Sequence, residues 1–80
     1  MNDILMVNDA NVESAIESDK PVILAIGASW CPDCRRAQPF FMQLAAANAD
    51  RAVFASCDSE QSPQVVAKFA VQHIPTMVAL

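Results

Sequence analysis

The stretch WCPDC, residues 30–34, places two cysteines three positions apart, after an apolar run and before a long helical pattern. The run, residues 22–26, reads VILAI and is apolar throughout, which is typical of a central strand covered on both faces. Beyond the cysteines, apolar residues recur at helical spacing as far as Asn48, and Pro39 is expected to kink this helix. The sequence therefore predicts strand, loop and helix in succession, with both cysteines where the helix begins. The predicted apolar face of the helix consists of Ala37, Phe40, Phe41, Leu44 and Ala45.

Short β-type runs alternate with helical segments along the rest of the chain. Further strands are predicted over residues 4–7, 52–57 and 76–80. A first helix is predicted to be capped by Asn8 or Asp9 and to end before Lys20, because a residue that precedes proline disfavours the helical conformation. Ser62 and Pro63 predict the start of another helix, as N-cap and first helical residue. The order β-α-β-α-β-α-β indicates an α/β fold with a central sheet flanked by helices, whose last strand can run in either direction.

The composition describes one small globular domain, residues 1–80, with 54% hydrophobic residues and a net charge of −4. Five basic against nine acidic residues argue against a nucleic-acid partner. Residues 1–7 lack the positive segment and the long apolar run of a signal peptide or a membrane span. We therefore expect a reducing, cytoplasmic compartment without membrane association.

A close pair of cysteines in a reducing compartment is more often redox-active or metal-binding than structural. Cys31 lies at the predicted helix N-terminus, where unpaired N–H groups and the helix dipole stabilise a thiolate, the nucleophile of disulfide exchange. Cys34 lies one turn inside and is expected to be shielded and to resolve a mixed disulfide. Asp33 opposes the effect of the dipole on Cys31, and Arg35 and Arg36 carry charge that can offset Asp33.

The sequence resembles the thioredoxin family over nearly all 80 residues. The resemblance rests on a strand, Trp-Cys-x-x-Cys, a helix with an internal proline, and Ile74-Pro75-Thr76 before a strand. It implies the thioredoxin-like fold with a mixed sheet, and a cis peptide bond before Pro75, beside Cys31. It also implies that substrate is bound by Trp30, Pro32, Ile74 and Pro75. The form WCPDC is similar to cytosolic relatives that reduce selected disulfides, although their usual longer insertion has no counterpart before Pro75.

The sequence departs from the family pattern in three places. Ala25 stands where the family usually has a buried aspartate that helps to deprotonate the resolving cysteine, so we expect slow resolution by Cys34. Gly27 stands where an aromatic residue is common. A complete thioredoxin continues beyond the strand that ends here at Leu80, so the predicted fold is C-terminally truncated. The last strand would then be an exposed edge, which favours self-association.

The predicted function is that of a thiol-disulfide oxidoreductase, a disulfide reductase with Cys31 and Cys34 as its redox-active centre. Its substrates would be protein or small-molecule disulfides, and the resemblance implies recharging by thioredoxin reductase, with no cofactor bound to the domain itself. One alternative is a thioredoxin-fold binding module with weak or no turnover. Another is a metal site built from both cysteines of the motif with Cys57 and His73, although the second pair lacks close spacing. Otherwise Cys57 is interpreted as a buried small residue or an accessory thiol, and His73 as a surface or groove-rim residue.

Overall fold

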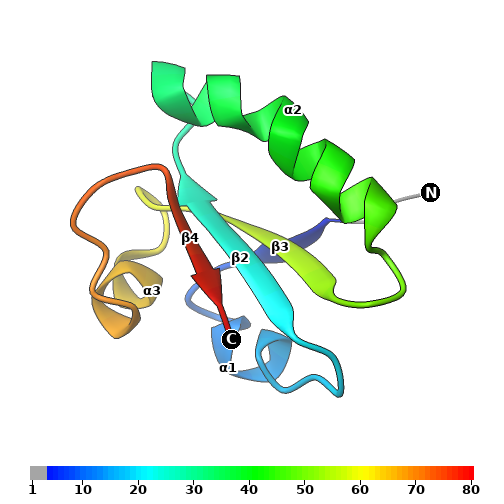
Figure 1. The fold of residues 1–80 in the computed structure, drawn as a ribbon. Helices are drawn as coiled ribbons and strands as arrows, with labels where there is room; N and C mark the ends of the chain where they lie inside the picture. The colour runs from blue at the N-terminus through cyan, green and yellow to red at the C-terminus, as the bar shows by residue number, and fades with distance from the viewer. Residues whose placement is uncertain (1–3) are drawn as a thin grey trace.

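The computed structural model describes residues 4–80, which form a four-stranded mixed sheet with the strand order β1-β3-β2-β4 (Figure 1). The strands are β1 (Leu5–Val7), β2 (Val22–Gly27), β3 (Val53–Asp58) and β4 (Thr76–Ala79). β3 pairs in parallel with both β1 and β2, whereas β4 pairs antiparallel with β2. The predicted element order is confirmed, and the direction that the sequence left open for the last strand is antiparallel.

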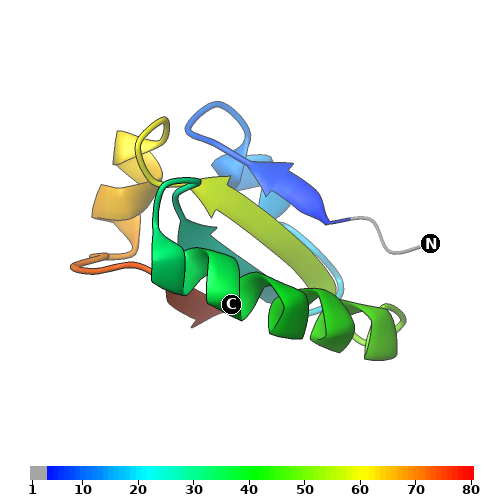
Figure 2. The ribbon, with the colours of Figure 1, turned by 90° about the horizontal axis from the view of Figure 1, so that it is seen from above.

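The helices lie on both faces of the sheet, as in the predicted fold class. They are α1 (Val12–Ala15), α2 (Pro32–Ala47) and α3 (Pro63–Lys68). α2 crosses one face, and α1 and α3 lie on the other (Figure 2). The long helix after the two cysteines ends where the sequence predicts, with Asn48 as its C-cap, and Pro39 lies inside it.

The core is divided unequally between the two faces of the sheet. The face of α1 and α3 carries the larger cluster of buried residues: Val7, Val12, Val22, Leu24, Ile26, Ala55, Cys57 and Val65. The face of α2 carries only Phe41, Ala45 and Phe54, where the two phenylalanine rings meet edge to face with centroids 5.7 Å apart. Alternate residues of β2 are therefore fully buried on one face and only partly buried on the other. The prediction that β2 is covered on both faces is therefore confirmed for the face of α1 and α3, and only in part for the face of α2.

The apolar face predicted for α2 is only partly buried. Phe41 and Ala45 pack on the sheet, but Phe40 is 72% exposed and Leu44 is 50% exposed. Successive helical residues point about 100° apart, so a single helix on this small patch of sheet can bury only a narrow stripe of its surface. The prediction that Phe40 and Leu44 face the core is therefore wrong.

The predicted N-terminal helix is reduced to one turn. The Asn8 side chain accepts hydrogen bonds from the N–H groups of Ala10 and Asn11, which form a turn, and α1 starts only after Asn11. Asp9 does not cap α1. Its carboxylate instead accepts a hydrogen bond of 3.0 Å from the N–H of Val65, the third residue of α3. Asp9 thus supplies the capping contact that the N-cap residue of α3, Ser62, does not make with its side chain.

The prediction that the chain lacks a signal peptide includes residues 1–3, which lie outside the described part of the chain. Within residues 4–80, none of the helices combines the length and the apolar character needed to cross a membrane.

Replacing Asp9 by alanine should lower the free energy of unfolding by about 1 kcal/mol, because the N–H of buried Val65 loses its partner. The measurement is urea unfolding followed by circular dichroism. Asp9→Asn keeps the acceptor oxygen and should lose less, and Asp19→Ala removes an equal charge from an exposed turn and should be nearly neutral. Equal effects of Asp9→Ala and Asp19→Ala would contradict the capping role.

Candidate redox site

The start of α2 holds the two cysteines against each other. Cys31 is the N-cap residue, with the extended backbone that this position requires, and Pro32 occupies the first helical position. The sulfur of Cys31 accepts a hydrogen bond of 3.2 Å from the backbone N–H of Cys34. A cysteine thus occupies a position that usually holds a serine, threonine or aspartate oxygen, and the helix N-terminus faces its sulfur. All three cysteines of the chain are free thiols.

The burial of the two thiols differs from the expectation that Cys34 is the shielded member. Cys31 is only 5% exposed, whereas Cys34 is half-buried. Cys34 lies across from Gly27 at the end of β2. A Cβ atom added at Gly27 would lie 2.9 Å from the sulfur of Cys34, closer than side chains pack. Gly27 therefore lets the Cys34 sulfur pack directly against β2, in space that any other residue would need for its side chain.

The surroundings of Cys34 favour its protonated form. Partial burial raises the pKa of the Cys34 thiol, and the hydrogen bond with the Cys31 side chain raises it further. The nearby negative charges of Cys31 and Asp33 act in the same direction, and a hydrogen bond with the backbone of Ala28 acts against them. The resolving thiol predicted from the sequence is therefore difficult to ionise.

The two arginines after the motif have different surroundings. Arg36 forms an exposed ion pair with Asp33, and this pair gives the carboxylate a local counter-charge. Arg35 forms no ion pair within residues 4–80 and instead lines a pocket beside Cys34. Only one of the two arginines thus offsets Asp33 in the way that the sequence predicted.

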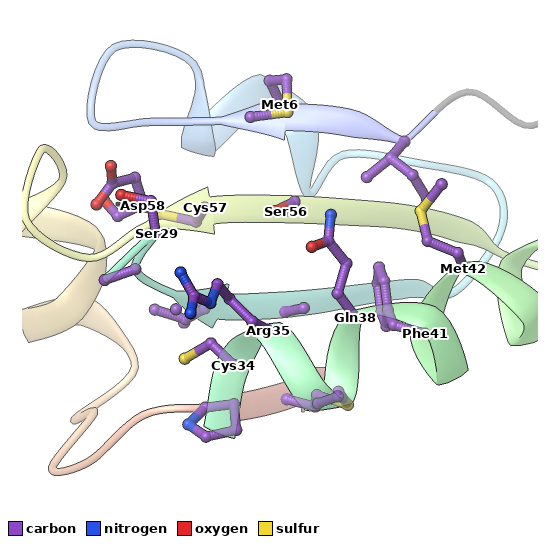
Figure 3. Close-up of a pocket in the computed structure, with 18 residues that line it drawn as sticks. Met6, Ser29, Cys34, Arg35, Gln38, Phe41, Met42, Ser56, Cys57 and Asp58 are labelled. Atoms are coloured by element: carbon purple, nitrogen blue, oxygen red, sulfur yellow. Dashed lines mark hydrogen bonds between the residues drawn. The ribbon is translucent and has the colours of Figure 1, made fainter. Parts of the chain in front are cut away.

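The pocket beside Cys34 lies between α2 and the uncovered part of the sheet and has a volume of about 560 Å³ (Figure 3). From α2 it is lined by Cys34, Arg35, Ala37, Gln38, Phe41 and Met42. From the sheet and the segments next to it, it is lined by Ile4, Met6, Ala25, Ile26, Gly27, Ala28, Ser29, Ser56, Cys57, Asp58, Pro75 and Met77. The lining is mainly apolar, and its charged members are Arg35 and Asp58.

The residues predicted to bind substrate surround the start of α2 and the loop before β4. Trp30 is 60% exposed next to Cys31, and Pro32 is exposed at the helix tip. The peptide bond between Ile74 and Pro75 is cis, as the resemblance implied. Pro75 lines the pocket together with Cys34. The side chain of Ile74 packs against the core under α1 and α3, which leaves its main chain as the part that can contact a substrate.

Cys57 and His73 are not brought to the dithiol as metal ligands. Cys57 is 3% exposed within the core under α1 and α3, and burial raises the pKa of its thiol. His73 is exposed, and its carbonyl accepts a hydrogen bond from the Thr76 hydroxyl. No group of three or more histidine, cysteine, aspartate and glutamate side chains within residues 4–80 could hold a metal ion. In this structure Cys57 is a buried small residue.

Of the α2 residues that line the pocket, the sequence prediction missed Gln38 and Met42 and did not place Arg35 there. Cys34, Arg35, Gln38, Phe41 and Met42 are spaced by one, three, three and one positions, which places them on one stripe of a helix. That spacing was available in the sequence. An apolar helical face does not include the arginine and the glutamine, and Ala25 and Gly27 were interpreted only as departures from the family pattern and not as small residues that face the helix.

Comparison with known proteins agrees with this arrangement. A family model described as Thioredoxin matches residues 3–80. A thioredoxin of Alicyclobacillus acidocaldarius is 34% identical over 74 residues, which cover 92% of this chain and 70% of that protein. Thioredoxin C-3 of Corynebacterium nephridii is 39% identical over 75 residues, covering 92% of this chain and 51% of that protein. The chain thus spans between about half and about three quarters of the length of such relatives.

Solved structures give the same result for the fold. Spinach chloroplast thioredoxin f superposes with a TM-score of 0.88 at 23% identity, over 99% of this chain and 67% of that one. The first thioredoxin domain of mouse protein disulfide-isomerase A4 superposes with a TM-score of 0.88 at 25% identity, over 100% of this chain and 59% of that one. The matched residues include both cysteines at the start of α2 and the cis-proline before β4. The chain belongs to the thioredoxin family.

Proposed function

We propose that this domain, residues 1–80, is a thiol-disulfide oxidoreductase that works as a disulfide reductase. The observation that carries the proposal is the contact at the start of α2, where the N–H of Cys34 donates to the sulfur of Cys31 at 3.2 Å. A sulfur at a helix N-terminus is stabilised as a thiolate, and a second thiol one turn away can displace it from a mixed disulfide. Membership of the thioredoxin family supports the same chemistry.

The reaction proceeds in two thiol-disulfide exchanges. The Cys31 thiolate attacks one sulfur of the substrate disulfide, a mixed disulfide forms, and the other substrate sulfur leaves as a thiolate that takes up a proton. The Cys34 thiolate then attacks the sulfur of Cys31. The second substrate thiol is released and the Cys31–Cys34 disulfide forms. The substrate gains two electrons, and a two-electron donor must return them to the domain, a role that we assign to thioredoxin reductase.

The groove for the substrate is proposed to lie between the helix tip and the loop before β4. Trp30 would cover one side of an extended substrate peptide, and Pro32, at the tip of α2, would contact the same side of that peptide. Pro75 and the main chain of Ile74 would form the opposite side. We propose a cytoplasmic location, because a close cysteine pair without a framework of further disulfide-forming cysteines is typical of reducing compartments.

Replacing Cys31 by serine should abolish reduction of insulin in an assay driven by dithiothreitol, because the attacking sulfur is lost. Replacing Cys34 by serine should instead stop turnover after the first exchange, and the mixed disulfide on Cys31 should accumulate and be visible by mass spectrometry under non-reducing conditions. The matched control is Cys57→Ala, which removes a thiol from the core and should leave the rate of the folded protein unchanged.

Two outcomes would contradict this assignment. If the wild-type protein shows no rate above the dithiothreitol background while Cys31 is open to alkylation, the domain is a binding module. If Cys31→Ser retains the wild-type rate, the chemistry lies elsewhere.

Replacing Ala25 by aspartate should speed the second exchange at neutral pH by about tenfold, because a carboxylate in the pocket beside Cys34 can accept its proton. The raised pKa of Cys34 means that few molecules carry its thiolate near neutrality, so the wild-type rate should rise with pH through the whole neutral range. The pH profile of the variant should be flatter. The measurement is the rate at which a preformed mixed disulfide on Cys31 is released.

The control for this variant is Ala25→Asn, which has nearly the same shape without the carboxylate. If Ala25→Asp and wild type release the mixed disulfide at the same rate, proton removal from Cys34 does not limit resolution.

Self-association is proposed to occur through β4. This strand is an edge of the sheet formed by residues 4–80; Met77 within it is 50% exposed, and Leu80 directly after it is 42% exposed. A second copy that pairs with this edge would satisfy its free backbone groups and cover these side chains.

Light scattering over a range of concentrations should therefore show a dimer. Replacing exposed Ala79 by lysine should weaken the dimer by about tenfold, since two like charges would meet across the edge. Ala67→Lys makes the same change on exposed α3 and should have little effect. A monomer at every concentration would rule out this association.

A further inference from the structure

The segment between α3 and β4 carries Ile74 and Pro75 of the proposed groove, and its first half is fixed by the end of α3. Ala70 has a left-handed backbone with φ of 53°, and the N–H of Val71 donates to a carbonyl of α3 at 3.0 Å. This hydrogen bond is the usual closing contact of a helix that ends on a left-handed residue. The side chains of Val71 and Ile74 both pack against the core under α1 and α3. The segment is therefore held by main-chain contact at its start and by two side chains further on.

The second half of this segment is closed by a side chain of β4. The Thr76 hydroxyl donates a hydrogen bond to the carbonyl of His73. Thr76 pairs in register with Ile26, whose side chain is buried under α1 and α3, so the hydroxyl lies on that side of β4 and not on the side of α2. The contact thus closes a bend from His73 to Thr76, with Ile74 and Pro75 at its centre.

The main chain of Ile74 has no backbone partner inside this bend. Neither its N–H nor its carbonyl forms a hydrogen bond with the backbone of residues 4–80. The antiparallel pairing of β2 with β4 ends at Ile26 and Thr76 and does not reach Ile74. An extended peptide that lies beside such free groups can hydrogen-bond to them as an added strand does. The direction of the Ile74 peptide groups therefore decides how well a substrate peptide can pair with them.

We propose that Thr76 is a positioning residue for peptide substrates, because its hydroxyl holds the His73 carbonyl and so fixes the direction in which the Ile74 main chain faces the groove. The Ile74 peptide groups pair with the main chain of the peptide that carries the disulfide. The proposal deepens the function proposed above and rests on it, since the exchanges at Cys31 and Cys34 are unchanged. The domain then prefers a disulfide on an extended peptide to a small disulfide without a peptide main chain.

Removing the hydroxyl affects substrate binding more than it affects folding. The segment keeps its core contacts, because the side chains of Val71 and Ile74 remain packed. His73 is exposed, so water can take the place of the hydroxyl at its carbonyl, and the loss of stability is small. The Ile74 peptide groups become free to adopt more orientations, and ordering them when a peptide binds lowers the affinity.

The test compares Thr76→Val, which keeps a β-branched side chain suited to a strand but lacks the hydroxyl, with Thr76→Ser, which keeps the hydroxyl. In the insulin assay driven by dithiothreitol, Thr76→Val should raise KM by about fivefold, as expected when one ordering contact is lost, and should change kcat by less than about twofold. The value of kcat changes little because resolution by Cys34 follows substrate binding. Thr76→Ser should return KM to within about twofold of the wild-type value.

A small disulfide separates this role from a general effect on the dithiol. The probe is hydroxyethyl disulfide, which has no peptide main chain, and mass spectrometry follows the rate at which it oxidises the reduced protein. Thr76→Val should react with this probe at the wild-type rate. The matched control is Ser14→Ala, which removes a hydroxyl that donates to the Asn11 carbonyl at 3.0 Å. Neither residue of this control lies in the proposed groove, so Ser14→Ala should change neither reaction.

The proposal is overturned if Thr76→Val keeps the wild-type KM for insulin, if it slows the reaction of hydroxyethyl disulfide as much as that of insulin, or if Thr76→Ser fails to restore KM. Should Thr76→Val unfold, which labelling of buried Cys57 would reveal, Thr76→Ala takes its place with the same three outcomes. Failure of the reductase function has a different signature, because the wild-type protein itself would then show no rate above the dithiothreitol background. Loss of the proposal alone leaves the wild-type rate intact.

Discussion

The hydrogen bond from the N–H of Cys34 to the sulfur of Cys31 is the contact on which the site depends. A helix begins with N–H groups that lack partners inside the helix, and here a sulfur takes the place of the usual capping oxygen. The same contact starts α2, sets the spacing of the two thiols and directs positive potential at Cys31. The geometry that caps the helix is therefore also the geometry that places the redox pair.

The position of α2 on the sheet follows from a small number of contacts. Phe41 packs edge to face on Phe54, and Ala45 completes the buried stripe. Near the helix tip, Gly27 permits the close approach of Cys34 to β2. The helix is thus anchored by aromatic contact at its middle and lies over small side chains at its N-terminal end. This difference creates the pocket, because the helix spans residues that do not fill the space beneath it.

Local sequence patterns predicted most of the helices and strands. They did not predict features that depend on residues far apart in the sequence. The apolar run of β2, the cysteine motif with Pro32, and Ser62 with Pro63 each determine a strand or a helix start through nearby chemistry. The cap of α3 escaped prediction because Asp9 lies 56 residues from Val65. The exposure of Phe40 was not predicted for a related reason: an apolar pattern on a helix does not show how much of the sheet surface is available to cover it.

The placement of the candidate site was similarly predictable only in part. The dithiol follows from a short motif and the cis bond before Pro75 from the family resemblance, but the burial of the two sulfurs follows from neither. From the sequence alone, Ala25 is the absence of a carboxylate that the family usually has, and Gly27 is the absence of a common aromatic ring. In the structure both departures affect the same place, because Ala25 and Gly27 both face the Cys34 side chain from β2. Ala25 leaves Cys34 without a proton acceptor, and Gly27 lets the Cys34 sulfur pack directly against β2. A carboxylate at position 25 would enter the pocket that Cys34 lines, whereas any side chain at position 27 would displace the Cys34 sulfur. Position 25 is therefore the place where a proton acceptor can be added without moving the thiol.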